Sequence, residues 1–128
     1  MKKKEIAFTL IELILVVVII ITLALIAIPS YSKSKQRAIE KEGISNVRLM
    51  AAAERIYRME WGGYAGCLNA VDCNSLLKLM LNTTNWAYNA DSSGNINATS
   101  NATTGMSCTY ALSPAGYDGA PSSSGTCP

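Results

Sequence analysis

One stretch of this sequence, residues 8–28, is apolar at almost every position, and it decides what the chain can fold into. As a helix that rises 1.5 Å per residue, it would be about 31 Å long, close to the hydrocarbon thickness of a bilayer. Its one charged side chain is Glu12, near its start, and lysines at positions 2–4 precede it. We therefore expect a membrane segment, with the lysines in the cytoplasm and the chain beyond Pro29 outside it.

The rest of the chain is a small polar domain, and its composition argues against several classes of function. The whole sequence has 128 residues, which suggests one domain. It contains no histidine, so a Ser–His pair and a histidine metal site are both unavailable. Between Lys33 and Arg58, acidic side chains interleave with basic ones, so there is no dense basic patch for a nucleic acid. We expect a protein that is not an enzyme and has no catalytic residue, metal site or cofactor.

The four cysteines all follow the apolar segment and are expected to form disulfides. They are Cys67, Cys73, Cys108 and Cys127. An even number beside an export signal favours disulfides over zinc, and the absence of a C-x-x-C spacing favours the same choice. Cys67 and Cys73 can close a small local loop, and Cys127 would most simply pair with Cys108, but the sequence leaves the connectivity open.

The sequence after Pro29 predicts that the helix continues. Pro29 lacks an N–H, so it should kink or loosen the helix. At 100° per residue, an apolar stripe lies opposite a basic face, and Leu49 and Ile56 widen the stripe on one side. The stripe comprises Ile39, Gly43, Val47, Met50, Ala53, Tyr57 and Trp61, and the basic face comprises Arg37, Lys41, Arg48 and Arg55. The pattern predicts residues 30–61 as the amphipathic part of one helix of about 50 residues that stops at Gly62–Gly63.

Two regions outside the predicted sheet carry weaker signals. Residues 62–85 are expected to form a connecting αβ loop with one short helix. Asn74 can cap that helix over residues 75–81, whose leucines and Met80 supply apolar contacts. The tail, residues 114–128, is rich in Gly, Ser and Pro and is expected to be irregular.

Residues 86–128 carry the signals of a small β-sheet closed by a disulfide. Residues 86–88 and 96–100 indicate a hairpin around a turn at 91–95. Residues 106–112 form the best strand, because apolar side chains alternate along it. The predicted fold class is α+β, with one long N-terminal helix packed on an antiparallel sheet of three or four strands.

The two ends of the apolar segment resemble those of a known family. Residues 7–13 read A-F-T-L-I-E-L, and residues 28–31 read I-P-S-Y. With the aliphatic run between them, they resemble the N-terminus of type IV pilins and of the pseudopilins of type II secretion. The resemblance implies a type IV pilin fold, in which residues 8–29 form a helix that spans the membrane and later lies in a filament core.

The resemblance also implies that the N-terminus is processed. A prepilin peptidase would remove residues 1–7 as a leader, cut between Ala7 and Phe8, and methylate the new amino group. Phe8, Glu12 and Pro29 would then be the first, fifth and twenty-second residues, as in that family. Ala7 departs from the family pattern, which normally has glycine before the cut; alanine is also small.

Glu12 is the residue to which the resemblance gives an assembly role. Its implied partner is the cationic amine of Phe8, on a neighbouring subunit or on its own chain. A subunit in the wrong register would bury the carboxylate unpaired, which is strongly unfavourable. The pairing would therefore set the axial register of the helices. Several pilins also close a C-terminal loop with a disulfide, and the pair Cys108 and Cys127 resembles that feature.

The implied function is that of a structural subunit of a type IV pilus, a filament used for adhesion, motility or DNA uptake. The precursor would lie in the inner membrane with its C-terminal domain outside the cytoplasm, and the mature subunit at the cell surface. Its partners would be copies of itself, the prepilin peptidase, the inner-membrane assembly platform and, before assembly, the lipid bilayer. Two alternatives stay open: a pseudopilin of a type II secretion system, and a membrane-anchored periplasmic binding domain.

Overall fold

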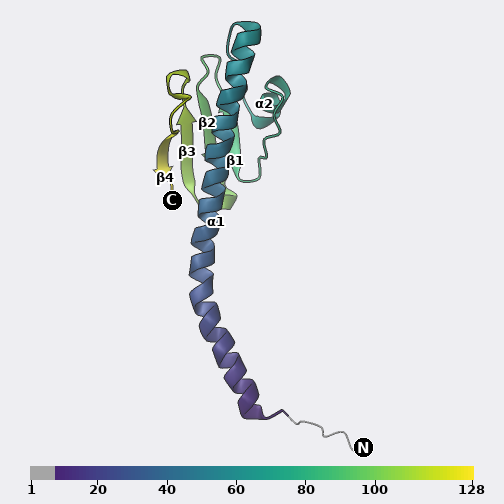
Figure 1. The fold of residues 1–128 in the computed structure, drawn as a ribbon, viewed down its shortest axis with the longest axis vertical. Coiled ribbons are helices and arrows are strands. Elements are labelled where there is room, and N and C mark those ends of the chain that lie inside the picture. Colours follow the sequence, from purple (N-terminus) through teal and green to yellow (C-terminus); the bar gives the residue numbers. More distant parts are fainter. Residues whose placement is uncertain (1–7) are drawn as a thin grey trace, which may run out of the picture. The chain divides into compact units, whose positions relative to one another are not determined.

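The computed structural model describes residues 8–128, so the predicted leader, residues 1–7 with Ala7, lies outside the described residues. One compact unit ends at Lys35, and a second comprises Gln36–Pro128. The fold is α+β, with one long N-terminal helix packed against a four-stranded antiparallel sheet (Figure 1). The predicted fold class is therefore confirmed.

Helix α1 spans Leu10–Trp61 and is a single helix of 52 residues. Pro29 lies inside it, so the prediction that the helix continues past the proline is confirmed. The helix stops at Gly62, whose φ of 79° is left-handed and whose N–H donates to the Arg58 carbonyl at 2.9 Å. Glycine adopts this conformation without a Cβ penalty, which explains why the helix ends at the glycine pair.

The buried face of α1 follows the predicted stripe over only part of its length. The buried residues of the helix are Ile39, Gly43, Val47, Met50, Ala51 and Glu54. Beyond Glu54 the prediction was wrong, because Tyr57 is only half-buried and Trp61 is 73% exposed. Leu49 and Ile56 are also exposed, so they do not widen the buried stripe. Periodicity gives the direction of a helix face, but the extent of its burial depends on how far the surface packed against it reaches.

The sheet contains four strands in the order β1-β2-β3-β4, each antiparallel to its neighbour. The strands are β1 Trp86–Ala90, β2 Ile96–Ser100, β3 Ser107–Leu112 and β4 Ser122–Thr126. Strands β1 and β2 form the predicted hairpin, with Trp86 opposite Ser100. The Asp91 carboxylate fixes the turn, because it accepts the backbone N–H groups of Ser93 and Asn95, each at 2.9 Å.

Strand β3 has the predicted alternation, whereas β4 was not predicted. Cys108, Tyr110 and Leu112 of β3 are buried, as expected. The tail is less irregular than predicted: a short 3₁₀ turn, η2 (Pro114–Gly116), leads towards β4. All five residues of β4 are exposed, so the strand has no apolar alternation to reveal it. It forms through its backbone ladder with β3, next to the disulfide of Cys127. A second 3₁₀ turn, η1 (Ala102–Thr104), lies between β2 and β3.

Helix α2 spans Ala70–Leu76, so a short helix exists but lies earlier than the predicted residues 75–81. Its N-cap is Asn69, whose side-chain oxygen accepts the Asp72 N–H at 3.0 Å. Asn74, the predicted cap, instead holds the backbone of Leu81: its oxygen accepts the Leu81 N–H at 2.7 Å, and its amide donates to the Leu81 carbonyl at 3.2 Å. Either asparagine suits a helix start, so the local sequence did not distinguish them.

The contact between α1 and the sheet centres on Trp86, whose ring packs directly against the backbone of α1 at Gly43. Trp86 is fully buried, and its indole N–H donates to the Ile39 carbonyl at 2.8 Å. A Cβ at Gly43 would lie only 2.6 Å from the Trp86 ring, so no larger residue fits without movement. The Tyr110 ring packs against the same indole, with 5.6 Å between centroids. This cluster positions the helix over the sheet (Figure 1).

Candidate functional site

The apolar segment of α1 is the first candidate site, because its large hydrophobic side chains are left uncovered within the described residues. Between Leu10 and Ile28, the large hydrophobic side chains are 44% to 77% exposed. By length and composition, α1 could cross a membrane, and none of its most apolar window is buried. A contiguous apolar surface of this kind marks an interaction site for lipid or protein. The segment therefore needs a cover that residues 8–128 of a single chain do not supply.

Glu12 lies in the first turn of α1, beside Thr9. The Glu12 N–H lies 3.3 Å from the Thr9 hydroxyl oxygen, which accepts it, and the hydroxyl lies 3.5 Å from the Glu12 carboxylate. Thr9, Leu10, Ile11 and Glu12 form the T-x-x-E pattern of a capping box. Sequence reasoning missed this local role, although the spacing would have revealed it. A carboxylate in the first turn is also stabilised by the helix dipole.

The other candidate residues of this segment lie on either side of Glu12. Phe8 precedes the helix and is 65% exposed. Thr22 satisfies its hydroxyl internally by donating to the Ile19 carbonyl at 2.8 Å, so it needs no external partner. Pro29 lies within the helix and carries no N–H for the turn before it. Glu12 is therefore the one charged side chain among residues 8–28, and this segment contains no basic side chain that could pair with it.

All four cysteines form disulfides, which removes the zinc alternative. Cys67 is bonded to Cys73, and Cys108 is bonded to Cys127. The first closes a local loop across the start of α2, and the second joins β3 to the tail. The pairing left open by the sequence is thereby assigned. The longer loop is the more stabilising one in the chain-entropy model.

Glu54 is a buried acid that sequence reasoning did not single out. It is fully buried, and its Oε2 accepts the Ala65 N–H at 2.9 Å, which holds the segment after α1 against the helix. Within residues 8–128, its Oε1 has no hydrogen-bond partner. Burial raises the pKa of Glu54 above its ordinary range, and the nearby Asp91 adds to the rise. At 100° per residue, Glu54 falls within the apolar stripe, which was the available signal.

Besides the bond from the Trp86 indole, three side-chain hydrogen bonds join α1 to the sheet or to the residue just before it, and no local pattern could have revealed them. Asn46 donates to the Tyr88 hydroxyl at 2.7 Å. The Tyr110 hydroxyl donates to the Glu40 carboxylate at 2.9 Å. A third bond, at 2.8 Å, joins the Asn85 amide to Glu42 Oε2. Burial is the main cause that raises the pKa of Tyr88 and of Tyr110 to about 12, so both hydroxyls stay protonated at neutral pH.

Within the described part of the chain, no group of three or more His, Cys, Asp or Glu side chains is placed so that it could hold a metal ion.

Comparison with known proteins finds no matching family model, no matching curated protein and no matching solved structure.

Proposed function

We propose that this chain is the structural subunit of a type IV pilus, a filament built from many copies of it. One observation carries the proposal: the apolar residues 10–28 are exposed in the single chain, yet they continue into a helix packed on a disulfide-closed sheet. A filament would supply the missing cover for this segment by burying the helices against one another. The resemblance of residues 7–13 to the pilin N-terminus supports the same conclusion.

The proposal gives the apolar segment two environments in succession. The inner membrane holds the precursor, with lipid around residues 10–28 and the disulfide-bonded domain outside the cytoplasm. The prepilin peptidase then cuts before Phe8, and the assembly platform moves the subunit into the filament. The disulfides support this orientation, because they persist in oxidising compartments.

In the filament, Glu12 makes the packing of the helices selective for one axial register. A charge towards the bilayer centre costs about 2.5–3.5 kcal/mol on insertion scales, and less near the headgroups. In the filament, the charged amine of Phe8 from a neighbouring subunit offsets that cost. A wrong axial register leaves the carboxylate buried and unpaired, so the pair fixes how subunits align.

The test is a filament preparation from cells that express the chain. The cells are sheared, the released filaments are collected, and the mass and N-terminal sequence of their subunit are measured. We expect long filaments of a chain that starts at Phe8 with a methylated amino group. A filament subunit that retains the lysines at positions 2–4 would contradict the processing step.

Two other results would replace the proposal with a different function. Loss of exoprotein secretion on deletion, without filaments in the wild type, would identify a type II secretion pseudopilin. A chain that stays in the membrane as a monomer, with no filament and no secretion defect, would identify an anchored binding domain.

A further inference from the structure

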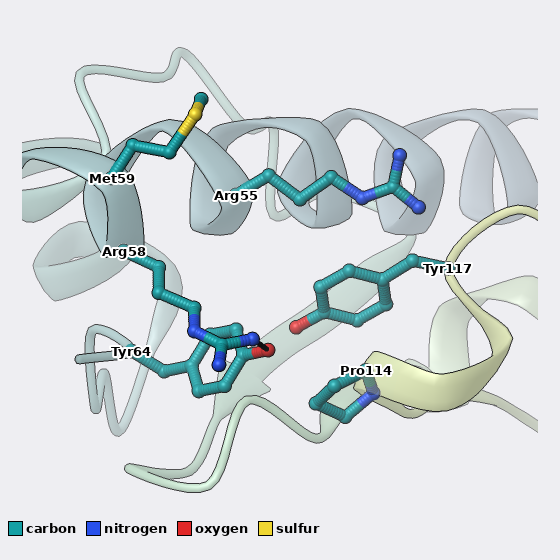
Figure 2. Close-up of a pocket in the computed structure, with 6 residues that line it drawn as sticks. All are labelled: Arg55, Arg58, Met59, Tyr64, Pro114 and Tyr117. Carbon is teal, nitrogen blue, oxygen red and sulfur yellow. Dashed lines mark hydrogen bonds between the residues drawn. The ribbon is translucent and has the colours of Figure 1, made fainter. Parts of the chain in front are cut away.

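A pocket with a volume of about 460 Å³ lies at the C-terminal end of α1, within residues 36–128. It is lined by Arg55, Arg58, Met59, Tyr64, Pro114 and Tyr117 (Figure 2). Small-ligand sites in proteins commonly have volumes of about 300–1,000 Å³. Its lining includes no residue of the apolar segment and no cysteine, so it is distinct from the features discussed above.

The side of the pocket formed by Tyr64, Pro114 and Tyr117 is held in place by contacts within the protein. The Tyr117 hydroxyl donates to the Gly94 carbonyl, and burial raises the pKa of Tyr117, so this donor stays protonated. Gly94 has a φ of 85°, and a Cβ there would lie 2.8 Å from Tyr64 and 2.9 Å from Pro114. The rings of Tyr64 and Tyr117 meet edge to face, with centroids 6.2 Å apart. A preset site of this kind loses little conformational entropy on binding.

Arg58 is the polar group best placed to hold a ligand. Figure 2 shows the Arg58 guanidinium next to the Tyr64 ring. Its Nη1 donates to the Tyr64 hydroxyl at 2.7 Å, and the guanidinium carbon lies 5.0 Å from the centroid of that ring. These contacts orient the guanidinium but occupy few of its five donors. Arg55–Asp118 is the one ion pair among residues 8–128, so no carboxylate there lies within ion-pair distance of Arg58.

Apart from the two tyrosine hydroxyls, the rest of the lining is cationic or apolar. Arg55 lies 5.5 Å from the centroid of the Tyr117 ring, and its partner Asp118 is 93% exposed. No acidic side chain lines the pocket. Met59 and Pro114 supply apolar surface beside the two tyrosine rings. The pocket thus combines a fixed guanidinium with walls suited to a flat or ring-shaped body.

We propose that this pocket binds a small ligand whose carboxylate is carried on a ring, with Arg58 as the bidentate partner of the carboxylate. The planar fork of arginine matches the two oxygens of a carboxylate. The ring then lies against Met59, Pro114 and the tyrosine edges. A sugar acid and an aromatic acid share this chemistry, and the experiment separates them. The inference does not depend on filament assembly.

The test uses the full chain in micelles of an uncharged polyoxyethylene detergent, with ¹³C-labelled methionine methyl groups. Met59 is the reporter, and its signal is assigned by its loss in Met59→Leu. Sodium glucuronate and sodium benzoate are titrated separately, with methyl glucoside and benzyl alcohol as neutral controls. We expect at least one carboxylate, but neither neutral control, to shift the Met59 signal saturably. A response to glucuronate alone identifies a sugar acid, and a response to benzoate alone identifies an aromatic acid.

Arg58→Gln should weaken that binding at least tenfold, and Arg58→Lys should restore only part of it, because lysine keeps the charge but loses the fork. Arg48→Gln, at an exposed arginine of the same helix outside the pocket, should leave the binding unchanged. The proposal is overturned if neither carboxylate shifts the Met59 signal. It is also overturned if the neutral controls shift that signal equally, or if folded Arg58→Gln binds as the wild type does.

Discussion

Residues 10–28 and residues 39–54 belong to the same helix, but only the second region is covered by its own chain. In the first, every large hydrophobic side chain is at least 44% exposed. In the second, Val47 and Met50 are fully buried. The difference is that residues 39–54 place most of their large apolar side chains on one face, which one sheet can cover. Residues 10–28 are apolar all round, and only lipid or several other helices can surround them.

The largest effect we expect comes from the tryptophan that joins the second region to the sheet. Trp86→Ala should lower the free energy of unfolding by about 3–5 kcal/mol, because it leaves a large cavity and removes the donor to the Ile39 carbonyl. Trp61→Ala, at a tryptophan that is 73% exposed, should change that free energy by less than about 0.5 kcal/mol. Urea unfolding of the full chain in micelles, followed by near-ultraviolet circular dichroism, measures both. Equal losses would show that α1 does not rely on this contact.

A matched valine pair sharpens the comparison between the two regions of the helix. Val47 is fully buried, whereas Val18 is 53% exposed. Val47→Ala should lower the free energy of unfolding by about 2 kcal/mol, from lost burial plus a residual cavity. Val18→Ala should leave it almost unchanged, because the sheet does not cover that position. The same urea titration decides the matter, and a similar loss in both variants would refute the division into two regions.

The smallest stability effect depends on pH and concerns Glu54. Burial raises the pKa of this residue above its ordinary value of 4.5 in the folded chain. Its contribution to stability is therefore full below about pH 4.5 and is lost as the pH rises through the raised pKa. Glu54→Gln should flatten that fall, since a neutral amide does not titrate.

Unfolding at a series of pH values from about 4.5 to 8 checks this expectation. The shift of Asp91 does not interfere, because its hydrogen bonds to Asn95 lower its pKa and its effect falls at more acidic pH. If wild type and Glu54→Gln show the same pH dependence, Glu54 is not the titrating group.

The sequence predicted the features that depend on local pattern. The 52-residue helix, its stop at Gly62 and the first hairpin each follow from a nearby signal: periodicity, a left-handed glycine or a turn. Strand β4 could not be predicted, because its exposed Ser-Ser-Ser-Gly-Thr has neither alternation nor apolar content. Its backbone pairs with β3, and the adjacent Cys127 is bonded to Cys108 of that strand, so the strand forms through contacts that its own side chains do not signal.

Of the two candidate sites, the sequence revealed the one at Glu12 but not the pocket. Glu12 was found because it is a charge within an apolar run, and its capping contact with Thr9 was equally readable in the sequence. The pocket beside Arg58 was not predictable, because it joins the end of α1 to residues of the tail through folding alone. All the residues that line the pocket come from one chain. The apolar segment differs, because residues 8–128 of that chain leave it exposed.

One substitution separates the local contact of Glu12 from its proposed role in assembly, and it tests the central proposal that the charge of Glu12 selects how copies of this helix align. Glu12→Gln keeps a side chain suited to the capping position but removes the charge. We predict normal membrane insertion and a strong loss of sheared filaments, whereas Glu60→Gln, at an exposed position of the same helix, leaves the filament yield unchanged. Normal filament yield from Glu12→Gln would contradict the account and leave Glu12 with only its local contact to Thr9.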